Sequence, residues 1–176
     1  MHALYKGGGY QFESDVVPGL KTLLRPIVNA MNSDRSRLSF VAIDFVASLA
    51  SLGRAFEPLL HFLFDALLKL CTRTSKVLIA RAEAAILRVI EETTLPAVLP
   101  HLREAVKDKS QTLRTAASVA ALQALQTFAP RDLANKISDV EEIIKCTGRD
   151  ANPAVRQTSR KIFEAYQILF PDRVDA

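Results

Sequence analysis

Tryptophan is absent from this 176-residue sequence, and aromatic residues together make up only 7% of it. Glycine is also scarce, with six residues, while Ala, Leu, Val and Ile supply most of the 49% hydrophobic content. A composition poor in aromatic residues and glycine favours packed helices over sheets. Hydrophobic content of this size, over this length, is enough for one compact domain with a continuous core.

The sequence contains only two cysteines, Cys71 and Cys146. Two thiols cannot form a framework of several disulfides, and each of them ends an apolar run. We therefore predict buried, reduced thiols and a cytoplasmic chain. The sequence also lacks a leader with a cleavage site and a stretch of about 18 uncharged apolar residues, so we expect a soluble protein that makes no contact with a membrane.

Charge of one sign is not in large excess. The 23 Lys and Arg residues stand against 19 Asp and Glu residues, which gives a formal net charge of +4. This mild basic excess favours an acidic protein partner over dedicated nucleic-acid binding.

Motifs of catalysis and metal binding are missing as well. The histidines His2, His61 and His101 lack the spacing of metal ligands, and neither G-x-S-x-G nor a P-loop occurs. Adjacent carboxylates such as Glu91 and Glu92 point about 100° apart on a helix and cannot share a proton across a substrate. The sequence therefore predicts a protein that is not an enzyme, with no catalytic residue, no cofactor and no metal.

Apolar runs of helical length fill the sequence from residue 20 to residue 170, and short polar or proline-containing breaks separate them. These runs form four pairs, which are 20–31 with 34–52, 58–71 with 76–92, 95–107 with 111–128, and 133–147 with 153–170. The pattern predicts about eight helices in one array over residues 20–171. An irregular segment, 1–19, would precede the array, and a tail, 172–176, would follow it.

The second members of the four pairs resemble one another. Their aligned positions are Leu38, Leu78, Leu113 and Val155. The interval of about 40 residues, with two helices in each unit, is typical of HEAT and armadillo arrays. Good N-cap residues stand three positions before the last three of these anchors, and they are Ser75, Ser110 and Asn152. The predicted fold is an all-α solenoid of stacked antiparallel helix pairs.

The helices also carry apolar stripes that a neighbouring pair would bury. On the segment 34–52 the predicted stripe is Leu38, Val41, Phe45, Leu49 and Leu52. In the last two pairs an arginine, Arg114 or Arg156, directly follows the anchor. We predict that these arginines pair with the turn carboxylates of Asp108 and Asp150, or with their repeat neighbours, and so fix the stacking.

The turns inside the pairs would lie along one edge of such an array. Their sequences are NSDRSR, TRTSK, KDKSQ and GRDAN. Basic residues outnumber acidic ones in these turns, which predicts a positive edge for an acidic surface. Lys76 begins a helix, where a cation opposes the macrodipole and helps the fold little, so partner contact and indifferent surface are equal alternatives for it.

Four turn-plus-helix segments resemble the TOG and TOG-like domains of the CLASP group of microtubule-associated proteins. They are NSDRSRLSFVA, TSKVLIARAEAAILRVIEE, DKSQTLRTAASVAAL and RDANPAVRQTSRKIFEAY. The resemblance implies a HEAT-repeat paddle whose intra-repeat turns bind αβ-tubulin or the microtubule lattice and regulate microtubule dynamics, in the cytoplasm and on the spindle. The implied partner-binding residues are Arg35, Arg37, Thr74, Ser75, Lys76, Lys109, Ser110, Arg149 and Asn152. Such domains commonly place a tryptophan on the turn of their first repeat, and this sequence has none. We expect a monomeric domain.

Two other interpretations fit the same residues. A HEAT-repeat scaffold or adaptor for a different acidic protein would bind through its helical faces or a peptide groove. A nucleic-acid-handling enzyme on this fold would need aromatic residues clustered on the polar faces, and the sequence shows no such cluster. Strong, salt-dependent DNA binding would favour the latter.

Overall fold

The computed structural model describes residue 8 and residues 12–173 of the chain. It divides into two compact units, Met1–Leu95 (unit 1) and Pro96–Ala176 (unit 2). The described residues of both units form helices and turns and contain no strand. The predicted all-α fold is confirmed. The division after Leu95 falls inside the segment 20–171 for which the sequence predicted one array.

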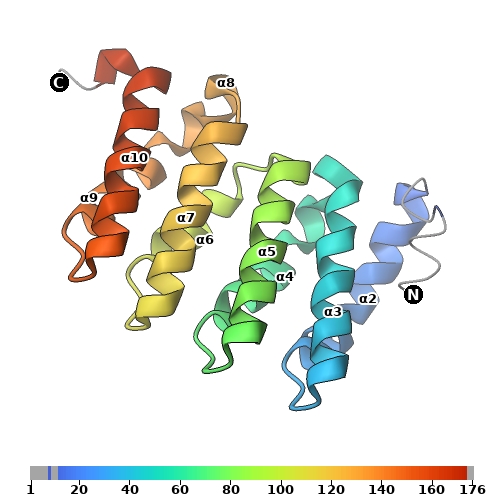
Figure 1. Ribbon diagram of the computed structural model, residues 1–176. Helices are drawn as coiled ribbons and strands as arrows, with labels where there is room; N and C mark the ends of the chain where they lie inside the picture. The colour runs from blue at the N-terminus through green and yellow to red at the C-terminus, as the bar shows by residue number, and fades with distance from the viewer. Residues whose placement is uncertain (1–7, 9–11, 174–176) are drawn as a thin grey trace. The chain divides into compact units, whose positions relative to one another are not determined.

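Unit 1 consists of two helix pairs. Its elements are α2 (Glu13–Met31), α3 (Ser36–Ser48), the 3-10 segment η2 (Leu49–Phe56), α4 (Glu57–Leu70) and α5 (Lys76–Thr93). Helix α2 packs on α4, and α3 packs on α5, so the first helices of the two pairs form one layer and the second helices form another. In Figure 1, α3 and α5 stand side by side in the front layer.

Unit 2 repeats this arrangement. Its elements are α6 (Val98–Ala105), α7 (Gln111–Thr127), α8 (Pro130–Leu133), η3 (Ala134–Lys136), α9 (Ile137–Gly148), α10 (Pro153–Leu169) and η4 (Pro171–Arg173). Helix α6 packs on α9, and α7 packs on α10. All four helix pairs predicted from the sequence are therefore present.

The first helix begins earlier than the sequence indicated. Helix α2 starts at Glu13, so the stretch 13–19 of the predicted irregular segment is helical, while residues 1–7 and 9–11 lie outside the described part of the chain. Pro18 and Gly19 are residues that commonly interrupt a helix, but both lie inside this one. Val17 and Leu20 are 8% and 1% exposed, and their burial offsets the hydrogen bond that Pro18 cannot donate.

The break between the two pairs of unit 1 lies at Gly53. Its φ of 57° and ψ of −129° belong to a region that residues with a Cβ rarely adopt. The stretch Ser36–Leu70 is long and apolar enough to cross a membrane by length and composition, although charged residues such as Asp44 and Asp65 lie within it. Gly53 interrupts it, and 56% of its most apolar window is buried, so this stretch forms the core of unit 1.

The predicted stripe on α3 is only partly buried. Phe45, Leu49 and Leu52 are at most 7% exposed, as predicted. Leu38 and Val41 are 46% and 49% exposed, so the prediction was wrong for them. These two side chains lie on the same side of α3 as Phe45, nearer the start of the helix. Together with α2 residues they line an apolar groove of about 310 Å³.

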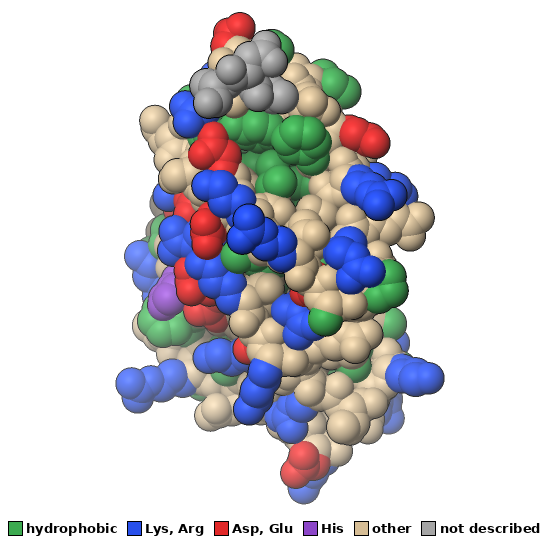
Figure 2. Space-filling view, turned by 90° about the vertical axis from the view of Figure 1, so that its left-hand side faces the viewer, with side chains coloured by type: hydrophobic (Ala, Val, Ile, Leu, Met, Phe, Trp, Pro, Cys, Tyr) green, Lys and Arg blue, Asp and Glu red, His purple; other side chains and the backbone are tan. Residues whose placement is uncertain are grey.

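Helix α10 also leaves large apolar side chains in contact with solvent. Phe163 is 40% exposed and Ile168 is 81% exposed. Figure 2 looks onto the side on which α10 lies in Figure 1, and it shows hydrophobic side chains gathered near the top with Lys and Arg side chains below them. The face of unit 2 to which α10 belongs therefore carries both apolar and basic side chains.

Candidate functional site

The turns of unit 1 lie next to each other at one end of its helices. The first turn (residues 32–35) connects α2 to α3, and the second turn (residues 71–75) connects α4 to α5. Both lie at the lower ends of these helices in Figure 1. The guanidinium Nη2 of Arg73 donates a hydrogen bond to the side-chain oxygen of Asn32 at 3.3 Å. The two turns are thus in direct contact.

Three of the predicted binding residues of unit 1 are exposed cations, namely Arg35, Arg37 and Lys76. Within the described part of the chain, their charged groups form no ion pair or side-chain hydrogen bond. Lys76 is the first residue of α5, where a positive charge opposes the helix macrodipole. These three charges therefore contribute little to the fold and are available to a partner.

The other two predicted residues of unit 1 have different roles. Ser75 is the N-cap of α5, and its hydroxyl accepts a hydrogen bond from the backbone N–H of Leu78 at 3.4 Å. Such a cap stabilises a helix by about 1 kcal/mol. Thr74 is exposed and lines a cavity between the two turns. Ser75 is therefore a structural residue first, and Thr74 faces solvent at the turn.

Unit 2 shows the same division into cations and caps. Its third turn (residues 106–110) and fourth turn (residues 149–152) carry Lys109 and Arg149, both exposed and without an ion pair among the residues that the structure describes. Ser110 caps α7 by accepting from the N–H of Leu113 at 3.4 Å. Asn152 caps α10 by accepting from the N–H of Ala154 at 2.9 Å.

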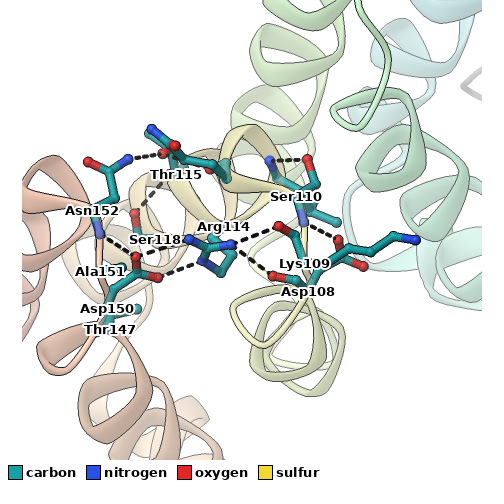
Figure 3. Close-up of polar contacts among 12 residues, drawn as sticks. Asp108, Lys109, Ser110, Arg114, Thr115, Ser118, Thr147, Asp150, Ala151 and Asn152 are labelled. Atoms are coloured by element: carbon teal, nitrogen blue, oxygen red, sulfur yellow. Dashed lines mark hydrogen bonds and ion pairs between the residues drawn. The ribbon is translucent and has the colours of Figure 1, made fainter.

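A partly buried ion pair joins the two turns of unit 2 (Figure 3). Arg114 donates from Nε to Oδ2 of Asp150 at 2.7 Å and from Nη2 to Oδ1 at 3.2 Å. Its Nη1 also donates to the backbone carbonyls of Asp108 and Lys109, each at 3.1 Å. This arginine therefore holds the third turn and the fourth turn together, as the sequence predicted.

The same contacts set the charge of the pair. The hydrogen bond from Arg114 lowers the pKa of Asp150 below its usual value, against the opposing effect of burial. The N–H of Asn152 also donates to Asp150 at 2.7 Å.

The second predicted arginine contacts backbone carbonyls instead of a carboxylate. Arg156 donates to the carbonyls of Asp150 and Ala151, at 2.6 and 2.9 Å, and so supports its own turn.

Sequence reasoning did not assign the contact between Arg73 and Asn32, nor the cavity of about 180 Å³ beside it. These residues belong to turns far apart in the sequence, so no local pattern connects them. One feature of the sequence indicates that the turns of the two units differ. When the anchors Leu78 and Val155 are aligned, Arg73 occupies the position of Asp150.

Comparison with known proteins places the chain in a family. A family model described as CLASP N terminal matches residues 3–176. Protein STU1 of Gibberella zeae is 26% identical over 100% of this chain, and Protein stu1 of Aspergillus fumigatus is 29% identical over 89% of it. The CLIP-associated protein of Arabidopsis thaliana is 27% identical over 88% of this chain. The chain spans only 16%, 12% and 11% of the lengths of these three relatives.

Among solved structures, the chain is similar to a designed armadillo repeat protein in complex with the peptide (KR)4. The TM-score is 0.49 at 19% sequence identity, over 81% of this chain and 64% of that one. The family assignment rests on the sequence comparisons. Because the family model matches nearly the whole sequence, the chain belongs to the CLASP N-terminal family, a family of microtubule-associated proteins.

Proposed function

We propose that this chain is a non-catalytic binding module that engages αβ-tubulin or the microtubule lattice through the turns inside its helix pairs. In this role it acts as a monomer in the cytoplasm, on microtubules and the spindle, and regulates microtubule dynamics. Family membership supports the microtubule setting. The turns support the mode of binding.

The proposal rests on a set of exposed cations that lie in the turns or in the first helical residues after them (the turn cations) and whose charged groups have no partner among the described residues. They are Arg35, Arg37 and Lys76 in unit 1, and Lys109 and Arg149 in unit 2. An arginine or lysine that already pairs within a protein must break that pair before it can bind another molecule. These five residues avoid that step and attract an acidic surface over long range.

Sedimentation velocity of purified αβ-tubulin, with and without this chain, tests the proposal at low and at physiological salt. We expect a complex that the double variant Lys76→Glu with Lys109→Glu removes. A complex of unchanged affinity with the double variant would contradict binding through the turns. The absence of any complex with the wild-type chain would direct the search to the microtubule lattice, measured by co-pelleting.

A HEAT-repeat scaffold for a different protein is the second candidate, and the apolar groove of unit 1 favours it. Leu38 and Val41 on α3 and Ile27 on α2 line this groove and present hydrophobic surface to solvent. If the groove binds the partner, Val41→Glu removes binding and the turn variant retains it. The opposite pattern supports the turns.

A further inference from the structure

The two units fill the space between neighbouring turns in different ways. In unit 2 the carboxylate of Asp150 lies between the third turn and the fourth turn and is held by Arg114 (Figure 3). In unit 1 the corresponding space is a cavity of about 180 Å³ between the first turn and the second turn. Its polar lining includes Asn32, Ser36 and Arg73.

The sequence explains why unit 1 lacks the bridging carboxylate. Alignment on Leu38 and Leu113 puts Ser39 in the position of Arg114, and alignment on Leu78 and Val155 puts Arg73 in the position of Asp150. Ser39 is 1% exposed, and its hydroxyl donates to the carbonyl of Met31 at 2.6 Å, so it does not bridge the turns. A cation has replaced the anion, and the space that the anion fills in unit 2 is left open.

The donors around this cavity are largely uncommitted. Arg73 forms one hydrogen bond, to Asn32 at 3.3 Å, and its other N–H groups have no acceptor among the described residues. The hydroxyls of Ser36 and Thr74 line the cavity as well, and neither forms a hydrogen bond within the part of the chain that the structure describes. Helix α3, which begins at Ser36, has no side-chain cap, so backbone N–H groups of its first turn add to the donors.

The described lining carries one charge of each sign, since Asp34 and Arg73 both line the cavity. The sequence next to these lining residues adds the cations Arg35, Arg37 and Lys76. An excess of N–H and O–H donors and positive charge selects an anionic group. Planar carboxylates suit an arginine in particular, because they accept two parallel hydrogen bonds from its guanidinium.

We propose that the cavity between the first turn and the second turn binds one carboxylate side chain of the acidic partner. The incoming carboxylate takes the place that Asp150 holds in unit 2, with Arg73 as its main donor. This site rests on the proposed function, since it adds a specific pocket to the turn cations. It also fixes the position of the partner relative to the turn cations, because one acidic residue of the partner must align with the cavity.

Three variants of equal charge change test the site in the same tubulin-binding assay. Arg73→Gln removes the main donor. Asn32→Asp places a carboxylate of the chain itself beside Arg73 and so occupies the site from within. Arg25→Gln removes an exposed cation of α2 outside the turns and serves as the control.

We expect the first two variants to weaken binding at least about tenfold and the control to change it less than about twofold. Equal effects of all three would show that only net charge counts and would overturn the cavity site. Circular dichroism checks that the helices are intact, which the exposure of Arg25, Asn32 and Arg73 leads us to expect.

A second measurement separates this site from the proposed function. A short glutamate-only peptide is titrated into the 15N-labelled chain, and the amide signals of Ser36 and Arg37 are followed by NMR. Saturable shifts in the wild type that vanish in Arg73→Gln support the cavity even if tubulin itself does not bind. Shifts that are absent, or identical in Arg73→Gln, overturn the cavity site even if tubulin binds through the other turn cations.

Discussion

The Asp150 carboxylate shows what a single residue does for the turns of unit 2. Its side chain is 5% exposed, and the side chain of its partner Arg114 is 17% exposed. Removal of the Asp150 carboxylate leaves the half-buried guanidinium of Arg114 with its two carbonyl acceptors but without its counter-charge. The pair is therefore important for the fold, although it lies in the turns that we propose for binding.

We predict that Asp150→Asn destabilises the chain by about 2 to 3 kcal/mol at neutral pH, because Arg114 loses its carboxylate. The pKa of Asp150 is lowered in the folded state, so its contribution is fully present above the unfolded value of about 4. That contribution is lost as the pH falls through the lower folded pKa. Urea unfolding between about pH 7 and about pH 2 measures this, and the variant should show a weaker pH dependence than the wild type.

The cysteines provide a second test at this scale. Burial raises the pKa of the Cys71 thiol to about 12, with a further contribution from the nearby carboxylate of Glu83. Burial also raises the pKa of Cys146, which is only half-buried. Since the thiolate is the reactive form, we predict that a thiol reagent at about pH 8 leaves Cys71 unmodified in the native protein and modifies it in urea. Mass spectrometry reads the result, and native modification of Cys71 before Cys146 would contradict it.

At the scale of elements, the predicted apolar stripe of α3 is exposed at the start of the helix and buried farther along. Phe45 is 7% exposed, while Leu38, two turns earlier on the same side of the helix, is 46% exposed. We predict that Phe45→Ala lowers the free energy of unfolding by about 3 to 5 kcal/mol and that Leu38→Ala lowers it by less than about 1 kcal/mol. Urea unfolding followed by circular dichroism measures both changes. Equal losses would mean that Leu38 is as well packed as Phe45, in contradiction to its exposure in the structure.

Local chemistry made most elements predictable. Good N-cap residues predicted the starts of α5, α7 and α10, and in the structure all three side chains cap these helices. They are Ser75, Ser110 and Asn152. The start of α2 was missed, because Pro18 reads as a breaker locally while the burial of Val17 and Leu20 depends on packing against other helices.

In the candidate site, too, local features could be predicted and features that depend on tertiary contacts could not. The exposed turn cations could be predicted from the spacing of helices, since a turn between two helices is solvated almost by definition. The cavity could not, because it depends on a contact between Arg73 and Asn32 that the chain makes across 41 positions. The exposure of Leu38 and Val41 was missed for a similar reason, since periodicity identifies an apolar side but not whether a neighbour covers it.

At the scale of the whole molecule, the net charge of +4 is modest, and its placement has more effect than its size. Several acidic residues are already paired within their own unit. Both carboxylate oxygens of Asp44 on α3 accept from Arg81 of α5 at 2.9 Å, and Asp139 of α9 accepts from Arg103 of α6 at 2.7 Å. Such pairing neutralises charge on the helices and leaves that of the turn cations exposed, so a partner is steered toward the turns.

Salt dependence provides the test at this scale. We predict that raising the salt from about 50 mM to about 200 mM weakens tubulin binding steeply, because exposed charges are screened over about 8 to 10 Å. The double variant Lys76→Glu with Lys109→Glu should bind weakly at both salts, while its melting temperature stays within about 2 °C of the wild type. Lys76 opposes the macrodipole of α5 and Lys109 is unpaired in the described structure, so neither replacement removes a stabilising contact. A loss of binding accompanied by a large fall in melting temperature would instead assign these lysines to the fold, and binding insensitive to salt would place the interface on apolar surface such as the groove of unit 1.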